Sequence, residues 1–253
     1  MSALVDVGRE GAVLLARLTR PEKKNALTSA MYERLIAAFQ EASLDPSLGA
    51  LVLTGSPGVF TAGNDIGDFL AAAMQASASN VETAGGRFIR TLATFDKPLV
   101  AAIEGPAVGI GTTLCFHCDL VYAAPSALFS MPFVNLGIVP EAGSSLLAPL
   151  RFGAARAAQY LLLAEPFGAE TARELGLVNA IIEPEALLAH ALAKAQALAA
   201  KPREALLATR RLLRGDQSAL LQRMDEEMRL FYERLRSPEA RAAFLAFTQK
   251  PKG

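Results

Sequence analysis

The first stretch with the features of a catalytic site lies between positions 98 and 119. An apolar run from Leu99 to Ile103, bounded by proline and glycine, is typical of a buried strand. Gly109 and Gly111 then precede a second apolar run that is long enough for a helix. A glycine-rich turn into a helix leaves free main-chain N–H groups, which favour negative charge. The stretch predicts an oxyanion site built from main chain, although such glycines also occur where they only permit tight packing.

Two further stretches support a site. Residues 60–65 read Phe-Thr-Ala-Gly-Asn-Asp and follow another buried strand, and residues 132–145 read Pro-Phe-Val-Asn-Leu-Gly-Ile-Val-Pro-Glu-Ala-Gly-Ser-Ser. Together with the central stretch, these motifs resemble the crotonase (enoyl-CoA hydratase/isomerase) superfamily in their order and spacing. The resemblance covers nearly the whole chain, from Arg20 to the last helix. It implies an α/β fold with a crotonase-like β-β-α spiral, a coenzyme A thioester as substrate and no prosthetic group.

The resemblance also implies an oxyanion hole made of two main-chain N–H groups. One follows the glycine of the Ala-Gly-x-Asp motif and here belongs to Asn64, and the other follows the glycine that opens the central helix and here belongs to Ile110. Proton removal beside a thioester places negative charge on the thioester oxygen. Each preorganised donor is worth roughly a hundred- to a thousandfold in rate.

The general base is the feature that distinguishes the family's reactions. Water-adding members use two glutamates, and the matching positions here hold Thr113 and Phe133, neither of which is a carboxylate. Glu141 instead occupies the place of the single catalytic glutamate in Δ3,Δ2-enoyl-CoA isomerases of the peroxisomal type. The resemblance therefore implies that Glu141 takes a proton from C2 and returns it to C4, or the reverse. The helix dipole alone also favours an acid here, before the helix that begins near Gly143.

An acyl pocket and a coenzyme A site are expected around this acid. A carboxyl group that faces an apolar pocket should have a raised pKa, which suits a group that acts as base and then as acid. The candidate pocket residues are Thr113, Phe133, Val134, Leu136 and Ile138. By resemblance, the coenzyme A residues are Lys23, Lys24, Ala26, Ala62, Asp65 and Ile66, with Lys250 reaching a neighbouring subunit's coenzyme A. An ordinary solvated side chain is the alternative for each lysine.

Other functions stay open at this point. The same scaffold supports an enoyl-CoA hydratase, or an isomerase of a ring-derived acyl-CoA of the epoxyphenylacetyl-CoA type. A coenzyme A-binding or protein-binding module without turnover is an alternative of another class, and the acid at position 141 argues against it.

The cysteines and histidines do not form a convincing metal site or catalytic triad. Cys115 and Cys118 share a helix face, but His117 points elsewhere and no fourth ligand is in view, so we expect a packed helix and no metal. His190 lies in an amphipathic helix and is expected on the surface. Neither histidine lies in the context of a Ser-His-Asp triad.

Composition and charge disfavour several other classes. Of the 253 residues, 52% are apolar, and the formal net charge is zero with no basic block to bind nucleic acid or an anionic membrane. No apolar run reaches the roughly 18 residues of a membrane-spanning helix, and there is no basic-then-apolar signal at the start. Two cysteines do not make a secreted disulfide framework. We expect a cytoplasmic enzyme, by resemblance one of fatty acid β-oxidation.

Along the chain, expected strands and helices alternate around the candidate site residues, which is typical of an α/β fold. Thr28 is expected to cap a helix that Asp45-Pro46 ends. The other expected elements are a hairpin of residues 2–8 and 12–18, strands at 51–54, 120–123 and 127–130, and helices over 66–76 and 81–95.

From Gly143 onward the pattern is helical, with a strand only at 178–182 and amphipathic helices over 203–214 and 216–248. We therefore divide the chain into residues 1–195, a spiral core with the coenzyme A and active sites, and residues 196–253, a C-terminal helical oligomerisation region. By resemblance the protein is a homotrimer or a dimer of trimers. Its apolar subunit contacts are expected from Phe231, Tyr232, Phe244 and Phe247.

Overall fold

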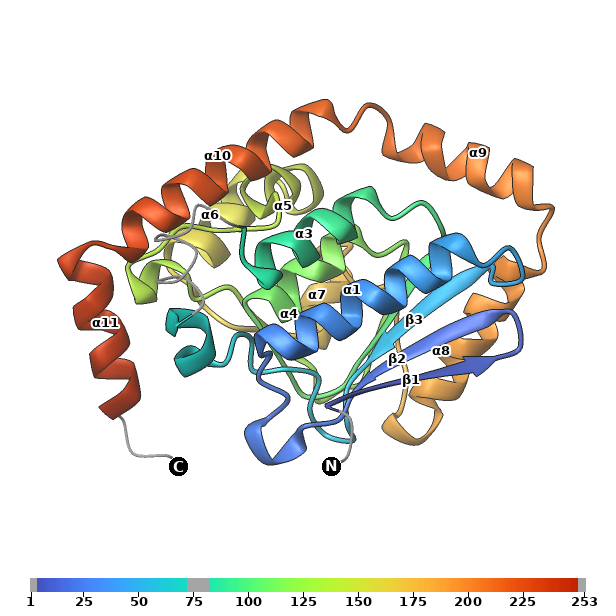
Figure 1. Ribbon diagram of the computed structural model, residues 1–253, viewed down its shortest axis with the longest axis horizontal. Coiled ribbons are helices and arrows are strands. Elements are labelled where there is room, and N and C mark those ends of the chain that lie inside the picture. Colours follow the sequence, from blue (N-terminus) through green and yellow to red (C-terminus); the bar gives the residue numbers. More distant parts are fainter. Residues whose placement is uncertain (1–3, 72–81, 250–253) are drawn as a thin grey trace.

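A computed structural model describes residues 4–71 and 82–249 of the chain (Figure 1). The expected N-terminal hairpin is present, because β1 (Val5–Glu10) pairs antiparallel with β2 (Val13–Leu18). The strands β3 (Ala50–Thr54), β4 (Leu99–Ile103), β6 (Leu120–Ala123) and β9 (Ala180–Ile181) then add in parallel. The resulting sheet has the order β1-β2-β3-β4-β6-β9.

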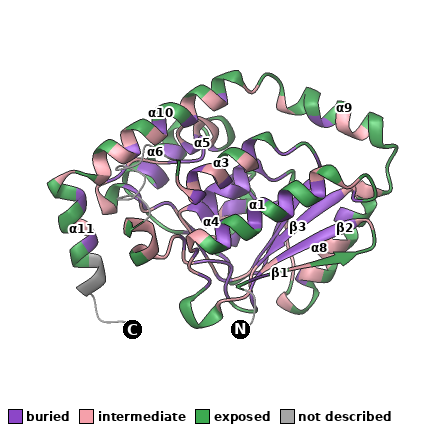
Figure 2. Ribbon diagram, viewed as in Figure 1, coloured by how far each residue is buried: buried purple, intermediate pink, exposed green. Residues whose placement is uncertain are grey.

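This six-stranded sheet is covered on both faces, which explains why its central strands read as continuous apolar runs. Alternate residues of β3 and β4 point to opposite sides and belong to two separate clusters. One cluster includes Leu51 and Leu99 with α1 (Ser29–Leu44), and the other includes Val52 and Val100 with α8 (Pro184–Ala199). Figure 2 shows the buried strands between these layers.

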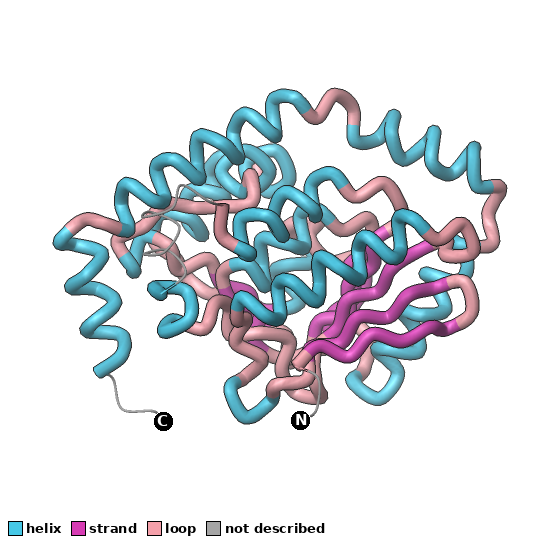
Figure 3. The backbone as a smooth tube through the Cα atoms, viewed as in Figure 1, coloured by secondary structure: helices cyan, strands magenta, loops and turns pink. Residues whose placement is uncertain are grey.

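A second, three-stranded sheet carries the central motif. It consists of β5 (Pro106–Val108), β7 (Leu128–Ser130) and β8 (Phe167–Gly168). The sequence pattern did not predict β8, because a two-residue strand shows no alternation. Figure 3 shows both sheets among the helices.

The helices follow the expected pattern with adjusted bounds. Thr28 caps α1, its hydroxyl accepting a hydrogen bond from the N–H of Met31 at 3.3 Å, as predicted. Residues 66–71 are helical, and the rest of the helix expected to residue 76 lies outside the described residues. The remaining helices are α3 (Ala84–Thr94), α4 (Ile110–Thr113), α5 (Ser144–Phe152), α6 (Ala154–Leu162), α7 (Ala169–Glu174), α9 (Arg203–Arg214), α10 (Ser218–Leu235) and α11 (Pro238–Gln249), with short 3₁₀ turns at Pro21–Lys23, Leu114–His117 and Val134–Leu136.

Two expected helices are shorter than predicted. The central helix has a single α-helical turn, α4, which tightens into a 3₁₀ turn and ends at Cys118, because the N–H of Asp119 pairs with Leu99 at 2.8 Å and starts the return into β6. The helix predicted over 216–248 is divided into α10 and α11. Pro238 has no N–H and disfavours helical backbone in the preceding residue, so the chain bends there.

The C-terminal helices fold back over the chain's own core (Figure 1). Phe231 and Phe244 are buried within this chain, and their rings lie 5.8 and 6.1 Å from the ring of Phe69. Assigning these two side chains to contacts with a neighbouring subunit was therefore wrong. The hydroxyl of Tyr232 lies 3.0 Å from that of Thr83, and the side chain of Phe247 lies outside the described part of the structure.

Within residues 4–71 and 82–249, no helix is both long enough and apolar enough to cross a membrane. The division of the chain at residues 195 and 196 stays a prediction.

Candidate active site

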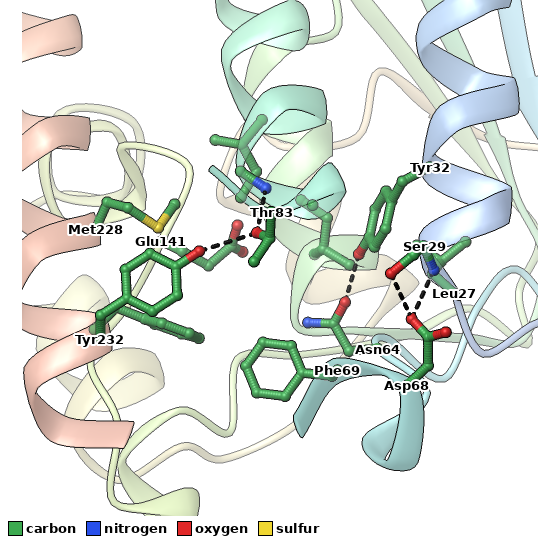
Figure 4. Close-up of a pocket in the computed structure, with 15 residues that line it drawn as sticks. Leu27, Ser29, Tyr32, Asn64, Asp68, Phe69, Thr83, Glu141, Met228 and Tyr232 are labelled. Atoms are coloured by element: carbon green, nitrogen blue, oxygen red, sulfur yellow. Dashed lines mark hydrogen bonds between the residues drawn. The ribbon is translucent and has the colours of Figure 1, made fainter. Parts of the chain in front are cut away.

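Two adjoining cavities lie between the loop after β3, the start of α4, the loop before α5, and the C-terminal helices. The larger has a volume of about 330 Å³ and the smaller of about 40 Å³. Both are lined by Asn64, Phe69, Ile110, Glu141 and Phe231. Figure 4 shows the smaller cavity, with Glu141 and Tyr232 on one side and Tyr32 and Asn64 on the other. Residues of the motifs at 60–65 and 98–119 therefore meet Glu141, the acid of the motif at 132–145, at one place.

The backbone joins the first two motifs directly. The N–H of Thr61 donates to Pro106 at 2.8 Å, and the N–H of Val108 donates to Thr61 at 3.0 Å. This pairing of the loop after β3 with β5 carries Asn64 and Ile110 to the same cavities, although 45 residues separate them in the sequence.

A glycine with positive φ precedes each of the two expected oxyanion residues. Gly63 has φ 85°, and Gly109 has φ 55° and ψ −115°, a conformation that residues with a Cβ rarely adopt. A Cβ at Gly63 would also lie 2.9 Å from the carbonyl oxygen of Val108. Among residues 4–71 and 82–249 we find no acceptor for the N–H of Asn64 or of Ile110. Both N–H groups are thus available to a ligand in the cavities.

Glu141 is the buried acid of the site, with 5% of its surface exposed. The hydroxyl of Thr113 donates a hydrogen bond to its Oε1 at 2.5 Å. Its Oε2 is buried and has no hydrogen-bond partner among the described residues. Burial raises the pKa of Glu141 to about 8, the Thr113 hydrogen bond works in the opposite direction, and the nearby charge of Glu227 adds to the rise.

The loop that carries Glu141 has an unusual backbone. Ala142 and Gly143 both have positive φ, at 58° and 69°. The carbonyl oxygen of Ala142 lies 2.7 Å from Nε2 of His117, so this nitrogen must carry the proton and donate it. Burial lowers the pKa of His117 to about 4, so the ring is neutral at physiological pH.

Glu227 holds the other side of this loop, and the sequence analysis missed it. Its carboxylate accepts hydrogen bonds from the N–H groups of Gly143 at 2.6 Å and Ser145 at 2.9 Å. A signal was present, since Glu227 lies at helical spacing between Met224 and Phe231 and so falls on the apolar stripe of α10. An acid on such a stripe is buried and needs partners.

The smaller cavity also contains a polar group from α1 that the sequence did not reveal. The hydroxyl of Tyr32 donates to Oδ1 of Asn64 at 2.6 Å and so fixes that side chain (Figure 4). Burial, with the charges of Glu141 and Asp68, raises the pKa of Tyr32 well above its usual value. Asp68 itself accepts from the N–H and the hydroxyl of Ser29, both at 2.7 Å.

Three of the five expected acyl-pocket residues, Phe133, Leu136 and Ile138, line the larger cavity. Val134 does not: it is 39% exposed on a 3₁₀ turn and is not among the residues that line either cavity. Thr113 is fully buried behind Glu141, where it contacts the acid and not the cavity. Including Val134 and Thr113 among the pocket walls was therefore wrong.

Two of the expected coenzyme A residues belong to the wall of the larger cavity. Ala62 and Ile66 line it, and the carbonyl of Lys24 accepts a hydrogen bond from Ala62 at 2.9 Å. Asp65 forms an ion pair with Arg20 at 2.8 Å, which lowers its pKa, and the same guanidinium donates to the carbonyl of Ala26 at 2.9 Å. The side chains of Lys23 and Lys24 are exposed, and Lys250 lies outside the described residues.

The cysteine and histidine side chains are not arranged as metal ligands. Cys115 and Cys118 are free and buried, and the residues that the structure describes contain no group of three or more His, Cys, Asp or Glu placed to hold a metal. His190 is partly exposed, and its ring packs 4.6 Å from that of Tyr122.

Comparisons with known proteins agree with this architecture. A family model described as enoyl-CoA hydratase/isomerase matches residues 8–253. Enoyl-CoA delta isomerase 2 of Rattus norvegicus is 34% identical over 250 residues, which cover 97% of this chain and 64% of that protein, so the chain spans less than two thirds of that relative. The 2,3-dehydroadipyl-CoA hydratase of Escherichia coli (strain K12) is 32% identical over 99% of this chain and 97% of its own length.

Solved structures extend the likeness to the fold. The structure of Pseudomonas aeruginosa OdaA matches with a TM-score of 0.93 and 42% identity over 98% of this chain and 100% of that chain. The chain therefore belongs to the enoyl-CoA hydratase/isomerase family, and it has the crotonase fold that the motifs predicted.

Proposed function

We propose that the protein shifts the double bond of a 3-enoyl-CoA to give a 2-enoyl-CoA, with Glu141 as the only proton carrier. The observation that carries the proposal is that Glu141, within the described residues, is the one carboxylic acid that lines both cavities. The same cavities are lined by Asn64 and Ile110, whose main-chain N–H groups have no acceptor in the described part of the chain. This arrangement suits a reaction that moves a proton beside a thioester.

The proposed reaction has two steps and consumes no water. Ionised Glu141 removes a proton from C2, so that the electrons of the broken C–H bond form a C1=C2 double bond conjugated with C3=C4, and the negative charge moves to the thioester oxygen. The N–H groups of Asn64 and Ile110 stabilise the negative charge on that oxygen. Protonated Glu141 then delivers the proton to C4, and the carbonyl re-forms with the double bond between C2 and C3.

The surroundings of Glu141 support one base over two. The positions that match the two glutamates of water-adding members hold Thr113, which is buried and bonded to Oε1 of Glu141, and Phe133, an apolar wall of the larger cavity. A hydroxyl cannot take a proton from water near neutral pH, and a phenyl ring cannot hold one. The apolar walls also keep water from the dienolate.

We further propose that coenzyme A binds beside Ala62 and Ile66, which line the larger cavity. Lys23 and Lys24 would meet its phosphates, while Ala26 and Asp65, held by Arg20, would shape the nucleotide site, with Lys250 contributing to a neighbouring subunit. The exposed lysine side chains support this assignment, because an ammonium group on a flexible stem is suited to bind phosphate.

A homotrimer or a dimer of trimers is the proposed assembly. Several large apolar side chains on the outer helices support it, since they lie exposed in the single chain. These are Leu150 of α5, Leu162 of α6, and Leu212 and Leu213 of α9, which are 69–84% exposed.

The direct test is an assay with 3-hexenoyl-CoA, because the relatives' names include both an isomerase and a hydratase. We expect the wild type to form 2-hexenoyl-CoA, and the isosteric Glu141→Gln variant to lose at least about a hundredfold in kcat. Glu226→Gln serves as the matched control, since it removes an exposed acid of α10. Rapid hydration of crotonyl-CoA that survives in Glu141→Gln would instead indicate a hydratase. Equal background rates for the wild type and Glu141→Gln would support a binding module.

A further inference from the structure

Glu227 is a buried acid that the proposed reaction does not use directly. It lies on the inner face of α10 with 4% of its surface exposed. Its two carboxylate oxygens accept from the N–H groups of Gly143 and Ser145, at 2.6 and 2.9 Å. These N–H groups start α5, whose N-cap residue Gly143 has no side chain to satisfy them. A residue from a distant helix thus supplies the cap.

The same turn sets the position of Glu141. Ala142 and Gly143 form two consecutive left-handed residues directly after Glu141, and such a conformation costs an alanine on the order of 1 kcal/mol. The turn needs external support, which comes from neutral His117 on the Ala142 carbonyl and from Glu227 on the Gly143 N–H. The approach of α10 is close, since a Cβ on Gly143 would lie 2.2 Å from Cδ1 of Leu220.

Glu227 and Glu141 also share a third, very small cavity of about 10 Å³. The other charged groups that line it are Glu82 and Arg90, from the side of α3. Arg90 is engaged by Asp225 at 2.7 Å and lies 3.8 Å from Glu82.

The cation nearest to Glu227 on its own helix is Arg223, which pairs with Glu226 at 3.2 Å. The nearby arginines are paired with exposed acids, although the charge of Arg223 still works against the rise in the pKa of Glu227. The two buried acids line the same small space. Burial raises the pKa of Glu227, whose charge in turn raises that of Glu141.

We propose that Glu227 is a positioning residue for the reaction: its carboxylate anchors the turn that aims Glu141 into the cavities, and it places a second acid at the small cavity that Glu141 lines. The inference rests on the proposed role of Glu141. It separates two contributions of one side chain, an anchoring contribution from the paired hydrogen bonds and an electrostatic contribution from the charge.

The test compares Glu227→Gln, Glu227→Asp and the control Glu226→Gln. Gln removes the charge and keeps one acceptor oxygen where the carboxylate offers a separate oxygen to each N–H group. Asp keeps the charge but is one methylene shorter. Two measurements are needed: the pH profile of kcat/KM for 3-hexenoyl-CoA, and a ¹³C NMR titration of the Glu141 carboxyl in the free enzyme, assigned by its loss in Glu141→Gln. Thermal unfolding of each variant shows that it is folded.

In Glu227→Gln we expect the Glu141 titration and the acid limb of kcat/KM to move to lower pH by about half a unit or more, with kcat reduced about tenfold. Glu227→Asp should keep the wild-type titration while kcat falls, and Glu226→Gln should match the wild type. If Glu141 titrates at the same pH in folded Glu227→Gln as in the wild type, the proposal is overturned, even if kcat falls. A residue with only a structural role would not change the pH at which Glu141 titrates. The NMR result does not depend on turnover, so it separates a failure here from a failure of the proposed function.

Discussion

Replacing Glu141 by glutamine should stabilise the protein, and the gain should depend on pH. A free glutamate carboxyl loses its proton near pH 4.5, whereas burial keeps Glu141 protonated in the native state up to about pH 8. Between these values the native state binds the extra proton, so stability falls as pH rises and the loss is complete above pH 8. Glutamine has the same shape, never ionises and avoids this loss.

The magnitude follows from the two pKa values. The difference between 4.5 and about 8, at about 1.4 kcal/mol for each unit, gives a maximum of about 5 kcal/mol. Relaxation of the surroundings around a buried charge reduces this figure, so we expect a gain of about 2–5 kcal/mol at pH 9. Near pH 5 the native carboxyl is neutral, and the two proteins should have nearly equal stability.

The assay is urea unfolding of the wild type and Glu141→Gln at pH 5 and pH 9, followed by circular dichroism at one fixed protein concentration. Glu226→Gln is the control, and its unfolding should follow that of the wild type at both pH values. If the difference in unfolding free energy between the wild type and Glu141→Gln were the same at pH 5 and pH 9, the argument that burial raises the pKa of Glu141 would be refuted.

Two further predictions concern activity. The kcat/KM of the wild type should rise with pH to a plateau above about pH 8, because Glu141 must be ionised to accept the first proton. Thr113→Val should move this rise to higher pH, because it removes the hydrogen bond that favours the carboxylate. A pH profile that is flat from pH 6 to 9 would contradict this. Gly109→Ala should reduce kcat at least about tenfold with a smaller change in KM, because a Cβ is incompatible with φ 55° and ψ −115° and would turn the N–H of Ile110 away. Unchanged kcat in the folded variant would argue against that N–H as a donor.

Local patterns predicted most of the fold. The apolar runs at β3 and β4 and the helix caps are signals within a few residues of each other, and the structure shows these elements within one or two residues of their expected bounds. The failures occurred where tertiary contacts decide. The central helix ends early because Asp119 pairs with the neighbouring strand, and β8 exists only through its pairing with β7.

The meeting of the motif glycines and Glu141 at the candidate site could be expected from the sequence, because these residues lie in motifs whose order and spacing resemble those of the family. The supporting residues of the site could not be expected, since Tyr32 and Glu227 lie on helices far from the motifs in sequence and reach the site only through folding. The same limit explains the error at Phe231, which packs against its own chain, whereas Val134 lies exposed on a 3₁₀ turn despite its apolar side chain. Hydrophobicity predicts that an apolar side chain is buried, but not against which surface.

The central claim is that Glu141 carries one proton from C2 to C4, and an isotope experiment tests it most directly. The substrate is 3-hexenoyl-CoA with deuterium at both C2 positions, and the product is analysed by NMR and mass spectrometry after partial conversion. Because the carboxyl group of Glu141 is buried, we expect part of the deuterium to appear at C4 of 2-hexenoyl-CoA, with no product above background in Glu141→Gln. Product that carries only solvent hydrogen at C4, formed equally fast by Glu141→Gln, would contradict the account.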